Sequence, residues 1–308
     1  MGGSAGRGHG DSQTTPVPCR VVIRLDAATV MLQWAVGGMA FTWFTTRRRE
    51  VGLGYGWLMR GVFLVMAVAA VGLGVRFNPD PVRDLAAVGV AIACAFALAV
   101  SIMRRSAGVS GQRADHDRRS ERIAAMTGID RSSTSPERSG GREFPPALDL
   151  VPVGIGVVGL IAAGVDAAVD ANVVVSILRV LVGAAFLGAI TDAMLLGHWY
   201  LVQPGLPRRL LNELVAAVMW LWPAQVAVML LPPGMLSVFT GSIDDGWGGT
   251  LGWLWAVCAG TTIVLLFVTR AALRERQYSA VMAATGLLYL AILTAFGTDL
   301  VARAVLSG

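Results

Sequence analysis

The sequence predicts an all-α, polytopic membrane protein with about eight transmembrane helices. Of its 308 residues, 55% are apolar and 15% are charged, whereas a soluble domain usually carries about 25% charged residues. Several apolar runs reach the roughly 20 residues that a helix needs to cross a bilayer. The short alternating segments typical of membrane β-barrels do not occur. These observations favour helical spans in lipid.

The expected spans follow the apolar runs in chain order. They cover residues 27–46, 57–77, 83–103, 147–168, 173–203, 209–232, 247–269 and 279–303. Each should be an α-helix, because backbone polar groups in lipid must pair within their own segment. The fifth span is the longest. At 1.5 Å per residue it extends for about 45 Å, so it should tilt within a hydrocarbon core of ~30 Å or protrude from it.

The spans and the polar stretches divide the chain into five parts. These are a polar N-terminal tail (1–26), three spans (27–103), a basic linker (104–146), five spans (147–303) and a short C-terminal tail (304–308). The linker is rich in Arg, Ser, Gly and acidic residues and poor in large apolar ones. Such a segment buries too little surface to offset its ordering entropy, so we expect it to be disordered.

Arginine predicts the orientation. Of the 25 basic residues, all of them Arg, 18 lie in or beside the loops that follow the first, third, fifth and seventh spans. The positive-inside rule places these loops in the cytoplasm and both termini outside, in the inner (plasma) membrane of a bacterium. Arg7, Arg20 and Arg24 in the N-terminal tail act against this orientation of the first span.

Composition and motifs exclude several function classes. The excess of basic residues is concentrated in the loops between spans, so it does not indicate nucleic-acid binding. The expected partners are the lipid bilayer and possible membrane proteins. The three cysteines form no CxxC and no cluster with histidine, so no metal site and no cofactor are expected. Phosphate-binding and hydrolase signatures are also missing from the sequence. An enzyme is therefore the less favoured interpretation.

Four features of the first four spans recur in order in the last four. Thr42-Trp43-Phe44 ends the first span and His198-Trp199-Tyr200 ends the fifth, and a basic turn follows each. A cysteine occurs in the third and the seventh span, and Gly-x-Asp at Asp166 and Asp299 ends the fourth and the eighth. Because each half would hold an even number of spans, the halves would form a parallel repeat. Chance similarity in Ala/Val/Gly-rich sequence is the alternative.

Asp192 is the principal candidate for function. It lies in the fifth span, about 18 Å from the helix end at Pro204 at 1.5 Å per residue. A carboxylate at that depth is costly unless it is paired, protonated or hydrated. We expect it to face the bundle interior, as a titrating group or as one half of a structural pair. Thr191 precedes it.

Partners for Asp192 should come from other helices. The candidates are Arg60, Gln225, Thr261, Thr262 and Tyr289. The Gly-rich stretch 52–56, which precedes the second span, is expected to be a tight turn and, alternatively, an anion site.

His198 stands six residues after Asp192, so the two side chains are about 120° apart around a helix and do not stack. Beside Trp199 and Tyr200 it is expected to be an interfacial anchor. The alternative is a role in haem, metal, quinone or proton chemistry. At the opposite end, salt bridges are expected among five residues at helix termini, or else solvated helix ends. These are Asp166, Asp170, Asp299, Arg179 and Arg303.

Three functions remain open from the sequence. The first is transport of protons, ions or a small solute through the helix bundle, with Asp192 as the titrating group. The second is a non-catalytic membrane subunit or assembly partner of a respiratory or envelope complex. The third is a membrane enzyme that acts on lipid or quinone near His198. The sequence does not specify a substrate.

Overall fold

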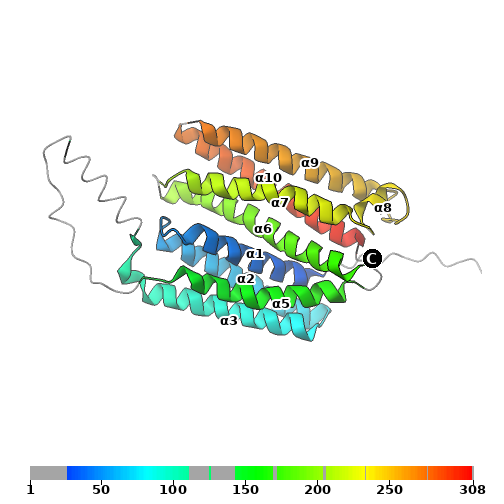
Figure 1. Cartoon of the computed structure of the whole chain (residues 1–308), viewed down its shortest axis with the longest axis horizontal. Coiled ribbons are helices and arrows are strands. Elements are labelled where there is room, and N and C mark those ends of the chain that lie inside the picture. Colours follow the sequence, from blue (N-terminus) through cyan, green and yellow to red (C-terminus); the bar gives the residue numbers. More distant parts are fainter. Residues whose placement is uncertain are drawn as a thin grey trace, which may run out of the picture.

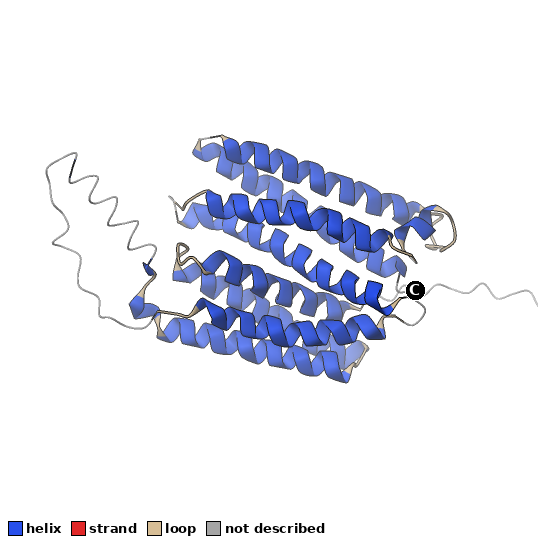
Figure 2. Ribbon diagram, viewed as in Figure 1, coloured by secondary structure: helices blue, strands red, loops and turns tan. Residues whose placement is uncertain are grey.

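The structure, a computed structural model, describes residues 26–110, 125, 143–168, 172–203, 206–232, 234–275 and 277–306. Over these residues it is all α-helical and without strands (Figure 2). Most of the predicted N-terminal tail and linker, and the last two residues of the predicted C-terminal tail, lie outside the described residues.

Eight long helices make up the described part of the chain. They are α1 (Ala27–Thr46), α2 (Leu53–Phe77), α3 (Pro81–Met103), α5 (Leu150–Asp166), α6 (Val173–Val202), α7 (Arg209–Leu230), α9 (Thr250–Arg274) and α10 (Tyr278–Leu306). Three short helices join them: η1 (Arg105–Ala107), η3 (Pro146–Asp149) and α8 (Met235–Phe239). The long helices lie roughly side by side, as a bundle (Figure 1).

Seven of these helices are long and apolar enough to cross a membrane, and α1 is the exception. The chain is therefore a polytopic membrane protein of about seven spans. α1 is less apolar because it packs against α2, α5 and α6 and buries Gln33, Thr42 and Thr45. A helix enclosed by protein need not present apolar residues to lipid on every side. The eighth span stays a prediction.

The helices form two groups of four (Figure 1). In the first, α1, α2, α3 and α5 contact one another in ring order, and in the second α6, α7, α9 and α10 do the same. Trp43 and Trp199 lie on the first helix of each group, and Asp166 and Asp299 on the fourth. Asp166 is exposed, however, and Asp299 is fully buried. The neighbour order is compatible with a duplication, which stays a prediction.

Several helix ends differ from the expected ones; α9, for example, ends at Arg274 rather than at residue 269. The Gly-rich stretch 52–56 is not a tight turn, because α2 already begins at Leu53. Tyr55 is fully buried and its ring lies 5.8 Å from that of Trp199, so tertiary packing extends the helix. At the other end of the chain, α10 continues to Leu306, beyond the predicted end at residue 303.

The two groups meet where α1 crosses α6. A Cβ on Gly188 would lie 2.1 Å from the backbone carbon of Gly37, and a Cβ on Gly37 would lie 1.7 Å from the carbonyl oxygen of Ala184. The two backbones are therefore in direct contact, which only glycine permits. α1 and α6 run in the same direction along the bundle. We call the end of the bundle at which both helices begin the Asp26 end, and the opposite end of the bundle the Arg49 end.

Candidate functional site

Asp192 is fully buried in the second half of α6. The expectation that its carboxyl faces the bundle interior agrees with this burial. Its side chain lies where α6 of the second group meets α1 of the first. The site therefore sits between the two groups rather than within one of them.

Hydroxyl groups surround the Asp192 carboxyl. Thr45 Oγ1 lies 2.5 Å from Oδ2, and Thr42 Oγ1 lies 3.5 Å from Oδ1. The Tyr55 hydroxyl lies 3.5 Å from the backbone carbonyl oxygen of Asp192. We call Asp192, Thr42, Thr45 and Tyr55 the Asp192 cluster. Within the described ranges, no arginine forms an ion pair with its carboxyl.

Thr45 has one hydroxyl proton and two neighbouring acceptors. Its Oγ1 also lies 2.9 Å from the Phe41 carbonyl oxygen, one turn back on α1. Thr45 donates to the Asp192 carboxyl and lies within hydrogen-bond distance of the Phe41 carbonyl oxygen, so two acceptors share its one hydroxyl proton. The same hydroxyl oxygen can accept a hydrogen bond from the carboxyl when the carboxyl is protonated.

Thr191 faces a different neighbour. Trp34 of α1 donates its indole N–H to Thr191 Oγ1 at 2.9 Å, and Thr191 donates to the Leu187 carbonyl oxygen at 2.7 Å. The Trp34 ring also lies 4.3 Å from that of Phe296 in α10. Thr191 therefore ties α1 to α6 next to the Asp192 cluster but does not bond to its carboxyl.

The partners expected for Asp192 are elsewhere. Arg60 binds Asp149 in η3 through two contacts of 2.7 Å, Nε to Oδ1 and Nη2 to Oδ2. Gln225 donates to Asp299 at 2.9 Å. Thr262 donates to backbone or to Thr294, and Tyr289 is 43% exposed. Thr261 is exposed as well. The expected grouping with Asp192 was therefore wrong, because Arg60, Gln225 and Thr262 bond to other residues and the other two side chains are exposed.

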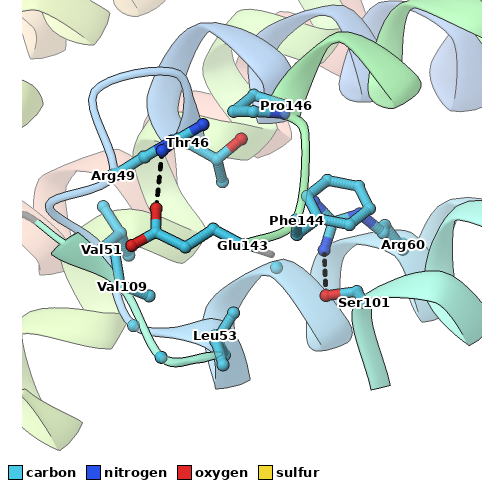
Figure 3. Close-up of a pocket in the computed structure, with 13 residues that line it drawn as sticks. Thr46, Arg49, Val51, Leu53, Arg60, Ser101, Val109, Glu143, Phe144 and Pro146 are labelled. Atoms are coloured by element: carbon cyan, nitrogen blue, oxygen red, sulfur yellow. Dashed lines mark hydrogen bonds and ion pairs between the residues drawn. The ribbon is translucent and has the colours of Figure 1, made fainter. Parts of the chain in front are cut away.

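The Arg60–Asp149 pair borders a small cavity at the Arg49 end, shown in Figure 3. Its volume is about 40 Å³. Arg60 donates to Ser101 at 3.2 Å, and its guanidinium carbon lies 4.1 Å from the centre of the Phe144 ring. Arg49 pairs with Glu143 at 2.6 Å across the cavity mouth. This region joins the two ends of the predicted linker to the first group of helices.

A larger cavity of about 100 Å³ lies at the Asp26 end, between the two groups. Arg179 and Arg303 line it together with Asp26. Arg179 donates to the carbonyl oxygens of Val228 and Leu231, at 2.9 and 2.7 Å.

The salt bridges expected at this end form only in part. Arg303 pairs with Asp299 at 2.6 Å. Asp166 is exposed, and Asp170 lies outside the described residues.

His198 is exposed and lines neither cavity. Its nearest aromatic neighbour is Tyr289, at 6.4 Å between ring centres. Among the described residues, no three His, Cys, Asp or Glu side chains come together as metal ligands. His198 therefore remains best described as an exposed side chain near a helix end.

Several polar residues of these sites escaped the sequence prediction. Thr42 and Thr45 resemble ordinary membrane threonines, and Asp149 stands at the expected edge of a span. Gln33 carried a usable signal, because an amide in the middle of an apolar run is costly without a partner. Tyr55 was hidden in the stretch read as a turn.

No family model, no curated protein and no solved structure matches this chain.

Proposed function

We propose that the protein transports protons, or an ion or small solute together with protons, through its helix bundle. Asp192 is the group that takes up and releases the proton. The protein would lie in the plasma membrane with α1 as an eighth span and both termini outside, as the arginine distribution predicts. The two groups of helices would be the parts that move relative to each other.

The observation that carries this proposal is the complete burial of Asp192 among uncharged hydroxyl groups. A buried carboxylate without a cation is strongly disfavoured, so the group takes a proton instead. Hydroxyls stabilise either form, because each can donate to a carboxylate or accept from a carboxylic acid. Uptake and release of the proton therefore need no large rearrangement of the cluster.

The position of Asp192 also supports transport. It bonds from α6 to Thr42 and Thr45 of α1, across the boundary between the groups. A change in its charge would alter the contact between them. Cavities occur between the groups at the Asp26 end and within the first group at the Arg49 end.

Proteoliposomes with an entrapped pH indicator test the proposal. An imposed potential or pH gradient should drive a proton flux in the unaltered protein, and Asp192→Asn should abolish it while leaving the amount of folded protein unchanged. Asp192→Glu keeps a titrating carboxyl and should retain part of the flux.

Asp166→Asn is the matched control, because Asp166 is an exposed acid on α5. Its flux should equal that of the unaltered protein. A full flux in Asp192→Asn would remove the residue from the mechanism, and the membrane-subunit hypothesis would then take precedence.

A further inference from the structure

Gln33 is a buried amide with unused hydrogen-bonding capacity. It is fully buried, and neither its amide nitrogen nor its amide oxygen has a hydrogen-bond partner. The amide oxygen of Gln225, also fully buried, has none either. Each such group lowers the stability of the folded chain when it is left unsatisfied. Buried polar groups are normally satisfied, by water where protein supplies no partner.

The two amides belong to one cluster around Asp299. Gln225 Nε2 donates to Asp299 Oδ1, and Arg303 Nε donates to Asp299 Oδ2. A Cβ on Gly183 would lie 2.1 Å from Gln33 Nε2 and 2.8 Å from Asp299 Oδ1, so these atoms converge on the same glycine. We call Gln33, Gln225, Asp299 and Arg303 the Gln33 cluster. Its charges cancel within the Asp299–Arg303 pair.

The cluster lies one helical turn below the cavity at the Asp26 end. Each of the helices α1, α6, α7 and α10 has a residue that lines the cavity and is four sequence positions from a residue of the cluster or from Gly183. The pairs are Thr29 with Gln33, Arg179 with Gly183, Met229 with Gln225, and Arg303 with Asp299. Four residues of helix correspond to about 6 Å. The cavity therefore lies about one helical turn from the cluster, and Arg303 belongs to both.

An apolar layer follows one turn deeper on the same four helices. Its residues are Gly37, Leu187, Leu221 and Ala295. Here the backbones of α1 and α6 touch at Gly37 and Gly188. Beyond this layer lies Asp192, nine residues after Gly183 on α6, which is about 13.5 Å along the helix axis. Two buried polar clusters thus lie at different depths along α6, with the apolar layer between them.

We propose that the Gln33 cluster is a second binding site, which takes a small neutral molecule that both donates and accepts hydrogen bonds. Water is the smallest molecule of this class. Gln33 supplies one donor group and one acceptor, and Gln225 supplies a second acceptor. The proposal rests on the proposed function in one respect: this site and Asp192 are successive stations on one path, and the apolar layer separates them.

Cysteine accessibility tests the site without measuring transport. In a background of Cys19→Ser, Cys94→Ala and Cys258→Ala, Gln33→Cys should react with aminoethyl methanethiosulfonate added at the Asp26 end. Ala35→Cys is the matched control, since Ala35 is a fully buried residue of the same helix. Gln33→Cys should react at least an order of magnitude faster, because its access does not require local unfolding.

Gln225→Cys repeats the test from α7, in case Gln33→Cys does not fold, and should give the same result. Reaction of both variants no faster than Ala35→Cys would overturn the proposal. Reaction of Thr45→Cys from the Asp26 end as fast as Gln33→Cys would overturn the separation by the apolar layer.

The two proposals fail separately. If Asp192 has no role in transport, proton flux survives in Asp192→Asn and the labelling of Gln33→Cys remains. If the Gln33 cluster is dry, labelling is lost and the Asp192-dependent flux remains.

Discussion

Asp149 and Asp192 carry the same chemical group and are equally buried, but their neighbouring groups differ. Both side chains are fully buried. Asp149 meets the guanidinium of Arg60 in a two-fold contact, whereas Asp192 meets hydroxyls. A neighbouring cation favours the charged form of a carboxyl, and burial without a cation favours the protonated form.

The two regions also differ in what they connect. Arg60 joins α2, η3 and Ser101 of α3, all within the first group. Asp192 joins α6 to α1, across the boundary between the groups. The first contact holds one group of helices together, and the second joins the two groups. The paired arginine thus distinguishes Asp149, which joins elements of one group, from Asp192, the candidate functional residue.

The same substitution at both positions should have the most unequal effect. Asp149→Asn leaves Arg60 buried without its carboxylate and should cost about 3–5 kcal/mol of stability. Asp192→Asn keeps the shape of the side chain and leaves no buried cation without its partner, so it should cost about 1 kcal/mol or less. Unfolding of both variants in detergent measures the difference. Equal losses would mean that Asp192 is charged and paired, and would end the comparison.

A double variant sharpens this result. Arg60→Met with Asp149→Leu removes both charges and should recover most of the stability lost in Asp149→Asn, because the uncompensated charge is gone. If it recovers nothing, the pair contributes through packing rather than charge.

Adding a methyl group at the contact between the two groups of helices should have the next largest effect on stability. In Gly188→Ala the new methyl group meets the backbone of Gly37, which cannot rotate away. We expect a loss of about 1–3 kcal/mol, as for other overpacked contacts. Gly61→Ala is the control, since a Cβ at Gly61 has no atom within 4 Å. It should be neutral or slightly stabilising in thermal unfolding. A silent Gly188→Ala would show that α1 and α6 separate easily.

Thr45→Val should have a smaller effect, on the order of 1 kcal/mol, because it removes one hydrogen bond to Asp192 at nearly constant volume. Thr46→Val is the control at the other acid. Thr46 Oγ1 lies 3.5 Å from Asp149, whose main partner is Arg60. Thr46→Val should therefore lower the stability less than Thr45→Val does. The opposite order in chemical denaturation would contradict the role assigned to Thr45.

Asp245, outside the spans, shows a third way to accommodate an acid with little exposed surface. Burial alone would raise the pKa of Asp245, but the backbone N–H groups of Gly249, Trp247 and Leu251 donate to the carboxylate and outweigh it, so the pKa is lowered. The carboxylate therefore stabilises the loop before α9 above its unfolded pKa of about 3.9, and this contribution is lost as pH falls through the lower folded value.

The expected effect at Asp245 is the smallest and the most local. Amide hydrogens at residues 247–251 should lose protection, measured relative to their intrinsic exchange rates at the same pH, as the pH of the unaltered protein falls into the acid range. Asp245→Asn should already exchange faster at pH 7, with the spans unchanged. Protection at residues 247–251 that is independent of pH would contradict the lowered pKa.

The positions of the spans and the anomaly of Asp192 could be read from the sequence because both follow from local costs. A helix in lipid needs about 20 apolar residues in a row, and a carboxylate among them is costly wherever the chain folds. α1 shows the limit of this reasoning, since protein rather than lipid covers its polar residues.

The partners were decided only by the tertiary structure. Arg60 and Asp149 are 89 residues apart, and Thr45 and Asp192 are 147 apart. A threonine has the same sequence signature whether its hydroxyl bonds to its own helix or reaches another. An arginine near a helix end reads alike whether it faces headgroups or a buried carboxylate. The sequence by itself determined which groups need a partner, because solvation cost belongs to the residue. Only the folded chain decided which partner each one has, because a hydrogen bond requires two groups within about 3 Å of each other.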